Sequence, residues 1–239
     1  MKLIQCAGYE QMSKAAAAGI TEVLAHKRNA VLCAATGNSP TGLYRELAHA
    51  AQVDPGLFAA VGLVKLDDWL GVPPDHPASC EHYLRITVVE PLRISSDRYL
   101  AFRPDASDPE QECTRVQTEL DRRGLDVCIL GLGANGHIGL NEPAATLEIG
   151  CHVARLTDET RRHGLLANLD TKPTHGLTLG IGDILRARKI VLLITGRGKE
   201  RAFSELLTGK LTTAAPVSLL ALHDDVDVFV DESSLTVDT

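Results

Sequence analysis

Positive charge is what this 239-residue sequence has too little of. Its 24 Lys and Arg residues are outnumbered by 31 Asp and Glu residues, so the formal net charge is -7 at pH 7. A general nucleic-acid binder or a membrane-surface binder needs a basic face, and the composition argues against both classes. An anionic small molecule stays compatible with this charge, because a few local donors can outweigh a diffuse negative field.

Closely spaced cysteines and long apolar segments are also missing. The six cysteines are scattered and show no zinc-type spacing; they are Cys6, Cys33, Cys80, Cys113, Cys128 and Cys151. Neither a signal peptide nor a membrane-spanning apolar run is visible, so we expect a reducing cytoplasm as the location. No internal repeat, low-complexity tract or linker occurs. A single domain over residues 1–239 is therefore the economical interpretation.

What the sequence does contain is a regular alternation of helical patterns and apolar runs. Helical spacing of apolar residues is found at 8–27, from 43 onward, at 79–92, at 109–123 and after 199. Strand-like apolar runs lie at 30–35, 61–66, 99–102, 125–130, 151–156, 189–195, 217–222 and 226–230. Strands that alternate with helices predict a Rossmann-like, three-layer α/β fold with a mostly parallel central sheet and right-handed crossovers.

The stretch with the clearest chemical content follows the apolar run 125–130. Its glycines can adopt backbone angles that a side chain would forbid; they are Gly131, Gly133 and Gly136. His137 and Glu142 come next, where α/β proteins usually place their chemistry. Glu142 could orient the imidazole and support its protonated form, and the amide of Asn135 could hold a ligand hydroxyl or the ring. The other eight histidines lack such a context and are interpreted as solvated or packing residues.

Two further strand–helix junctions have the composition of anion-binding turns. Glycine, small hydroxyls and free backbone N–H groups at a helix start can cradle a negative charge. The first junction consists of Thr36, Gly37, Asn38 and Ser39. At the second, Gly196 to Lys199, the ammonium of Lys199 could sit beside a phosphate. The alternatives are a glycine turn that merely caps a helix and an ordinary surface lysine.

A pair of carboxylates, Asp67 and Asp68, ends the apolar run 61–66. A carboxylate next to low-dielectric walls can have a raised pKa and act as a general base near neutrality. Asp is also common as a cap of the turn that follows a strand. We therefore expect one of the two to be the base and the other to be the cap.

Three of these segments resemble the signature blocks of the glucosamine-6-phosphate deaminase/isomerase family. The blocks are Ala35–Pro40, Leu66–Gly71 and Gly131–Pro143, in the family's order, and Leu156–Arg161 and Thr195–Lys199 fit its later blocks. The resemblance thus extends over nearly the whole chain. Within the family, three features are most similar to the galactosamine-6-phosphate isomerase branch: Val64–Asp67 with the following Trp69, Ser79–Glu81 and Cys151–Val153.

The resemblance implies an enzyme that opens the ring of a hexosamine 6-phosphate and releases ammonia. His137, assisted by Glu142 and beside the Asn135 amide, would move the proton on the ring oxygen. Asp67 would carry a proton between C2 and C1 through an enolamine, before hydration and loss of ammonia give the ketose 6-phosphate. The phosphate would be held by Thr36, Gly37, Asn38, Ser39 and Lys199. No metal and no organic cofactor is implied, because proton transfer alone completes the reaction.

The chain departs from the family pattern at several positions. Many members carry Asp where this chain has Asn135. The regulated hexameric members bind an allosteric phosphate through Ser, Arg and Lys, where this chain has Ala145, His152 and Ala154, so the same control is not expected. The family's lid arginine has no single counterpart. Its candidates are Arg155, Arg161 and Arg162, within a segment, 144–175, that we expect to be a mobile lid.

The resemblance favours galactosamine 6-phosphate as substrate and tagatose 6-phosphate as product, with glucosamine 6-phosphate and fructose 6-phosphate as the alternative pair. A 6-phosphogluconolactonase would share the fold but lacks the continuation Asn141–Pro143. A non-catalytic sugar-phosphate sensor is a third hypothesis, against which the retained Asp67 and His137 argue. The expected partner is a small sugar phosphate, with neither nucleic acid nor membrane. A homo-oligomer is compatible with the sequence, although no self-complementary patch is legible.

Overall fold

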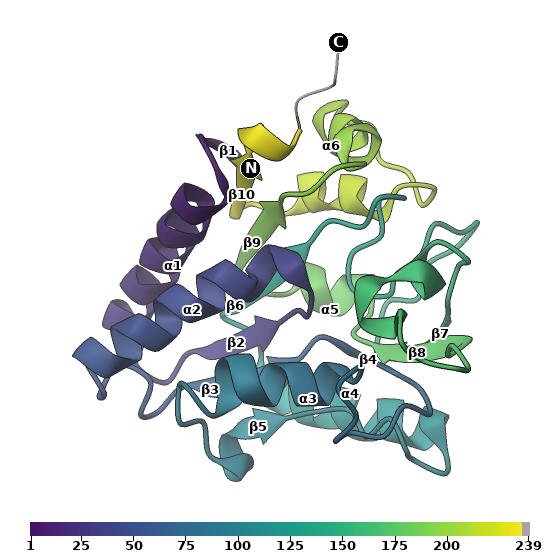
Figure 1. Ribbon diagram of the computed structural model, residues 1–239, viewed down its shortest axis with the longest axis horizontal. Helices are drawn as coiled ribbons and strands as arrows, with labels where there is room; N and C mark the ends of the chain where they lie inside the picture. Colours follow the sequence, from purple (N-terminus) through teal and green to yellow (C-terminus); the bar gives the residue numbers. More distant parts are fainter. Residues whose placement is uncertain (236–239) are drawn as a thin grey trace.

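The computed structural model describes residues 1–235, and its centre is one seven-stranded sheet (Figure 1). In spatial order the strands are β1 (Lys2–Cys6), β10 (Val226–Asp231), β9 (Lys189–Ile194), β6 (Val127–Gly131), β2 (Val31–Ala34), β3 (Gly62–Lys65) and β5 (Tyr99–Leu100). Every neighbouring pair is parallel. The predicted mostly parallel central sheet is confirmed.

Helices cover both faces of this sheet and complete the three layers (Figure 1). One face packs against α1 (Tyr9–His26), α2 (Asn38–Val53) and α3 (Cys80–Leu84). The other face packs against α4 (Pro109–Arg123), α5 (Ile181–Leu185) and α6 (Glu200–Leu207). Within residues 1–235, no helix combines the length and the apolar character needed to cross a membrane.

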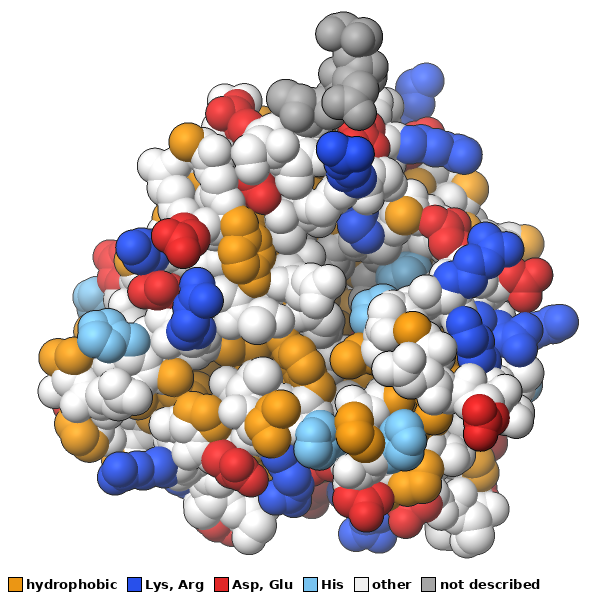
Figure 2. All heavy atoms as spheres, in the orientation of Figure 1, with side chains coloured by type: hydrophobic (Ala, Val, Ile, Leu, Met, Phe, Trp, Pro, Cys, Tyr) orange, Lys and Arg blue, Asp and Glu red, His pale blue; other side chains and the backbone are white. Residues whose placement is uncertain are grey.

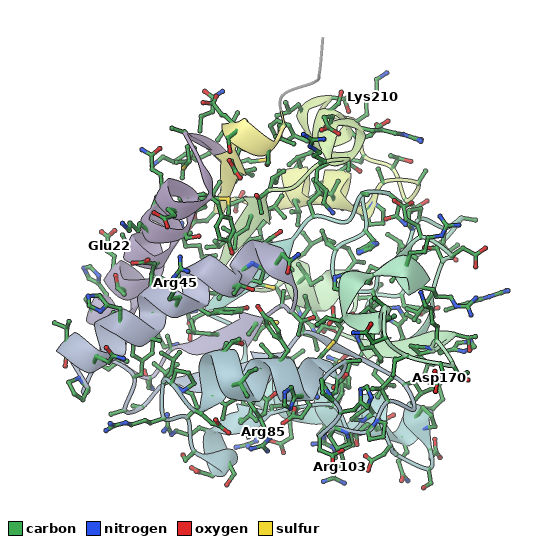
Figure 3. All side chains as sticks on the ribbon, viewed as in Figure 1. Glu22, Arg45, Arg85, Arg103, Asp170 and Lys210 are labelled. Atoms are coloured by element: carbon green, nitrogen blue, oxygen red, sulfur yellow. The ribbon has the colours of Figure 1, made fainter. Side chains whose placement is uncertain are left out.

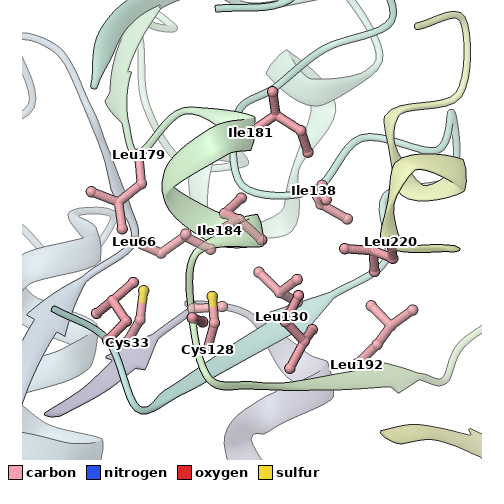
Figure 4. Packing of buried hydrophobic residues seen from close by; sticks show 14 of the residues in the cluster. Cys33, Leu66, Cys128, Leu130, Ile138, Leu179, Ile181, Ile184, Leu192 and Leu220 are labelled. Atoms are coloured by element: carbon pink, nitrogen blue, oxygen red, sulfur yellow. The ribbon is translucent and has the colours of Figure 1, made fainter. Parts of the chain in front are cut away.

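Burial on both faces explains the continuous apolar runs of the central strands. In β6, Val127 and Ile129 pack into the core under α1 and α2, whereas Cys128 and Leu130 pack into the opposite core. Cys128 lies there near Ile184 of α5 (Figure 4) and is fully buried, as expected for a cysteine used as a small hydrophobe. Charged side chains lie on the surface instead, and Figure 3 shows three exposed examples, Glu22, Arg45 and Lys210.

A second, smaller sheet lies beside the first, at the lower right of Figure 1. Its antiparallel strands are β4 (Asp67–Trp69), β8 (His175–Thr178) and β7 (His152–Arg155), in that order. The chain leaves the parallel sheet after Lys65 and enters β4 at Asp67, so the two carboxylates begin a new strand instead of ending the old one. Leu66 alone separates the two sheets along the chain. The N–H of Leu179, just after β8, donates to the Leu66 carbonyl at 2.9 Å.

The other differences from the sequence patterns are local. The helix expected from residue 43 begins at Asn38, because Gly37 turns the chain with a φ of 111°. Segment 217–222 belongs to a 3-10 helix, Pro216–Leu222. Strand β1 was not predicted, since as an edge strand it buries only Cys6 and therefore has no apolar run. The strand β8 and the short helix α5 were missed as well.

Candidate active site

A cavity of about 390 Å³ lies at the carboxyl ends of β2, β6 and β9 and against the start of β4. Figure 2 shows this face of the molecule hollowed to the right of its centre, with histidine side chains at the rim. Seven of the predicted site residues line the cavity: Thr36, Gly37, Asn38, Ser39, Asp67, His137 and Lys199. Five separate segments of the chain therefore converge here, since Trp69 and residues 159–164 also contribute to the wall.

The turn between β2 and α2 presents unused backbone donors to this cavity. Gly37 is the N-cap residue of α2, and no side chain caps the helix. Tyr9 and Tyr83 fix the turn from outside by donating hydroxyl hydrogen bonds to the carbonyls of Asn38, at 2.6 Å, and Gly37, at 2.8 Å. Tyr9 also accepts from the Gly42 N–H at 2.7 Å, but neither tyrosine uses the N–H groups of the first turn, so the positive end of the helix dipole stays available for an anion.

Asp67 meets the physical requirements of a general base. Its side chain is only 7% exposed, and within residues 1–235 no protein donor hydrogen-bonds to its carboxylate. Burial, followed by the negative charge of Asp68, raises the pKa of Asp67 to about 7, although the Lys65 ammonium opposes the rise. A carboxylate with this pKa is poised to accept and return a proton near neutral pH.

A buried ionic network holds the wall behind Asp67. The Lys65 ammonium, with 0% exposure, lies 2.6 Å from Asp68 Oδ2 and 2.9 Å from Glu81 Oε2. Asp68 Oδ1 accepts from the backbone N–H of Trp69 at 2.8 Å and of Cys80, the first residue of α3, at 3.1 Å. Asp68 is thus occupied by the ion pair and by backbone N–H groups, whereas Asp67 lines the cavity.

His137 is held by a carboxylate that lies behind it. Glu142 Oε2 lies 3.4 Å from His137 Nδ1 and accepts from Asn135 Nδ2 at 2.9 Å, while Asn135 Oδ1 accepts from the His137 N–H at 3.1 Å. Burial alone would raise the pKa of Glu142, but the hydrogen bond and charge of His137, with donors from Thr160 and Asn135, bring it down to about 2. Asn135 and Glu142 are therefore outside the cavity lining and support the ring.

Close approach explains one of the glycines. A Cβ atom on Gly133 would stand 2.6 Å from three ring atoms of His137, so only glycine lets the imidazole fold over this turn. At Gly131 the same construction meets only ordinary contacts of 3.8 Å with Ser39. The position of the imidazole therefore requires glycine at residue 133 but does not require it at residue 131.

Lys199 reaches the same cavity from the turn before α6. Partial burial lowers the pKa of its ammonium, and the charge of Glu159 opposes that effect. Of the three arginines considered for the lid, only Arg162 lines this cavity. Arg155 and Arg161 line a separate groove with His175.

Sequence reasoning missed three residues of the wall: Trp69, Thr160 and His163. Thr160 Oγ1 lies 3.3 Å from His137 Nδ1, and the rings of Trp69 and His163 pack with their centroids 5.8 Å apart. His163, interpreted from the sequence as a solvated or packing residue, does pack against Trp69, and it also lines the cavity. Its position within the charged segment 157–163 was the available signal.

Fold and site together define a class: an α/β protein whose sheet edge brings a buried carboxylate, an imidazole and two glycine-containing turns to one cavity. In the described part of the chain, no three His, Cys, Asp or Glu side chains form a group that could hold a metal ion. Residues 7–229 match the family described as glucosamine-6-phosphate isomerases/6-phosphogluconolactonase. The chain belongs to this family.

Individual relatives agree with that assignment. The chain is 41% identical over 227 residues to the putative deaminase AgaI of Escherichia coli strain K12, covering 93% of this chain and 89% of that relative. It is 35% identical over 240 residues to a glucosamine-6-phosphate deaminase of Thermoanaerobacter sp. strain X514, covering 99% and 95%.

Solved structures confirm the fold. A monomeric glucosamine-6-phosphate deaminase, described as a missing link of the NagB superfamily, matches with a TM-score of 0.92 at 36% identity and covers 99% of this chain and 100% of its own. The 6-phosphogluconolactonase of Trypanosoma brucei matches with a TM-score of 0.75 at 19% identity, covering 97% and 96%. At that identity the second likeness concerns the fold alone.

Proposed function

We propose that this protein isomerises and deaminates a hexosamine 6-phosphate, releasing a ketose 6-phosphate and ammonia. The observation that carries the proposal is the convergence of Asp67, His137 and Lys199 with the turn after β2 on one cavity. Membership of the family and the names of its deaminase relatives support the same reaction class.

Ring opening is the first step and falls to His137. The imidazole delivers a proton to the ring oxygen and takes up the proton of the C1 hydroxyl, so the bond between C1 and the ring oxygen breaks and an aldehyde remains. Glu142 Oε2 lies 3.4 Å from His137 Nδ1, and the low pKa of Glu142 keeps this carboxylate ionised beside the ring. Asn135 holds that carboxylate in place.

Isomerisation and deamination follow at C2. The Asp67 carboxylate removes the C2 proton, which gives an enolamine, and returns a proton to C1, which leaves an imine at C2 and a CH₂OH group at C1. Water then adds to C2, and the C–N bond breaks to release ammonia and leave the ketone. A pKa of about 7 suits a group that must both take and return this proton.

The substrate phosphate is assigned to the other end of the cavity. Backbone N–H groups of Gly37, Asn38 and Ser39 at the start of α2 offer donors, with the Thr36 hydroxyl beside them and the Lys199 ammonium supplying positive charge. We further propose that residues 1–239 form one domain and that segment 144–175 closes over the bound sugar. The solved deaminase relative is described as monomeric, so the homo-oligomer considered from the sequence is not included in this proposal.

Galactosamine 6-phosphate, converted to tagatose 6-phosphate, is the substrate that we propose, with glucosamine 6-phosphate as the alternative. Two residues that mark the galactosamine-like pattern, Lys65 and Glu81, form one buried ion pair behind Asp67. The 41% identity to the putative deaminase AgaI and the 35% identity to the glucosamine-6-phosphate deaminase of Thermoanaerobacter support deamination with either sugar.

The test is a paired assay of both hexosamine 6-phosphates. Ammonia release and formation of tagatose or fructose 6-phosphate are measured, and we expect the larger kcat/KM for galactosamine 6-phosphate. Asp67→Asn provides the inactive control for both substrates. If neither amino sugar reacts while 6-phosphogluconolactone is hydrolysed, the protein is a lactonase. Binding of both sugars without turnover would instead identify a sensor.

A further inference from the structure

His163 lies in the cavity at the end assigned to phosphate, although no step above uses it. It follows the short 3-10 turn Thr160–Arg162 between β7 and β8. Its Nε2 atom lies 3.6 Å from the point where a Cβ on Gly37 would stand, directly over the uncapped start of α2. The absence of a side chain at Gly37 therefore leaves the imidazole facing the backbone donors of the turn.

The orientation and the tautomer of this imidazole are both fixed by the protein. The backbone N–H of Leu165 donates to His163 Nδ1 at 3.3 Å, so in the neutral ring the proton is on Nε2. The Trp69 ring packs against the imidazole with a centroid distance of 5.8 Å. A neutral His163 thus presents an N–H donor to the same space as Gly37.

The charges around His163 favour its neutral form as long as no anion is present. Burial, then the charges of His137 and Lys199, lower the pKa of the His163 imidazole. The titratable side chains that line the cavity with it are Asp67, His137, Glu159, Arg162 and Lys199. A phosphate dianion placed between Gly37 and Lys199 would supply the negative charge that this end of the cavity lacks, and would thereby favour the imidazolium.

We propose that His163 is a phosphate ligand that takes up a proton as the substrate binds. It donates through Nε2–H when neutral and becomes an imidazolium beside the bound dianion. This inference rests on the phosphate end of the proposed function. His163 would then have to release the phosphate group and a proton before the product can leave the cavity.

Sulfate is the appropriate probe, because it stays a dianion at both pH 6 and pH 8 and does not depend on turnover. Its affinity for the full-length protein is measured by titration calorimetry at these two pH values. Two variants separate donation from protonation: His163→Gln keeps an N–H near the Nε2 position but cannot be protonated, and His163→Asn has no donor there. His175→Gln, on β8 and outside this cavity, is the matched control.

We expect wild-type affinity for sulfate to increase from pH 8 to pH 6 about tenfold more than the affinity of His163→Gln does. The Asp67 charge also changes in this range, but it does so in both proteins and cancels in their ratio. His163→Asn should bind sulfate about tenfold or more weakly at both pH values, since it loses a hydrogen bond to a charged group. His175→Gln should match the wild type.

Kinetics with the amino-sugar phosphate give a second readout. His163→Asn should raise KM at least about tenfold while kcat changes less than about threefold, because the residue binds a non-reacting part of the substrate. Equal sulfate affinities of wild type, His163→Gln and His163→Asn at both pH values would overturn the inference and leave His163 as a packing partner of Trp69. Loss of the amino-sugar activity with the sulfate pattern intact would overturn the proposed reaction only.

Discussion

The protonation state of Asp67 that favours folding is the opposite of the state that a general base needs. Its pKa in the folded protein is about 7, against an ordinary value of 3.8, so folding favours the protonated carboxyl. The contribution to stability is therefore complete below pH 3.8 and is lost as the pH rises through 7. Above that pH the protein maintains a buried, ionised carboxylate that the proposed reaction needs and that the fold does not.

Replacing that carboxylate should therefore stabilise the protein while it abolishes activity. For Asp67→Asn we expect the free energy of unfolding at pH 8 to rise, by roughly 4 kcal/mol as an upper limit from the pKa difference. At pH 4 the two proteins should differ little. Urea unfolding at both pH values measures the effect, and kcat should fall about 10²- to 10⁴-fold. A destabilised Asp67→Asn at pH 8 would contradict the raised pKa.

The second residue-scale prediction concerns Lys65. Lys65→Met leaves Asp68 and Glu81 buried without their shared cation, and we expect a loss of about 3–5 kcal/mol in the free energy of unfolding. Arg122→Met, which breaks an exposed pair with Glu119, is the control and should cost about 0–1 kcal/mol. Similar losses in the two variants would mean that the buried network contributes no more to the free energy of unfolding than an exposed ion pair does.

At the scale of elements, the glycine turn after β6 determines where the imidazole lies. Gly133→Ala places a methyl group 2.6 Å from the His137 ring, so the ring has to move, and kcat should fall at least about 100-fold. Gly131→Ala, two residues earlier, adds a methyl group in ordinary contact and should retain most of the activity. The test is the steady-state kinetics of Gly133→Ala and Gly131→Ala. Equal activities of the two variants would show that catalysis tolerates displacement of the His137 ring.

The same scale shows what a sequence can and cannot predict. The strands β6 and β9 were predictable because burial on both faces demands unbroken apolar runs, and parallel strands bring their carboxyl ends to one edge. Asp67 and His137 could therefore be expected to converge. Strand β8 was not predictable, because its His175 is exposed and its four residues show no strong strand pattern. The charged segment 157–163 gave a signal for His163, but its place in the cavity could not be derived, because it depends on how β7 and β8 return the chain.

Over the whole molecule, stability should be distributed unevenly between the two sheets. Strands β6 and β9 have neighbours on both sides and helices on both faces, so their amides should exchange with deuterium most slowly. The segment 157–173, held mainly by short turns, should exchange fastest and should slow when sulfate or substrate is added. Hydrogen-exchange mass spectrometry measures both. An unchanged rate in 157–173 on addition of ligand would contradict the lid assignment.

The single hydrogen bond from Leu179 to Leu66 has a practical consequence for protein engineering. This bond joins the residue where the chain leaves the parallel sheet to the residue that follows β8. It therefore holds together the two ends of segment 66–179, which contains Trp69 and His163. A graft of residues 144–178 from a relative with another sugar preference would leave that anchor, Asp67 and His137 in place. Such a graft therefore tests whether residues 144–178 affect sugar preference while Lys65 and Glu81, which mark the galactosamine-like pattern, stay unchanged.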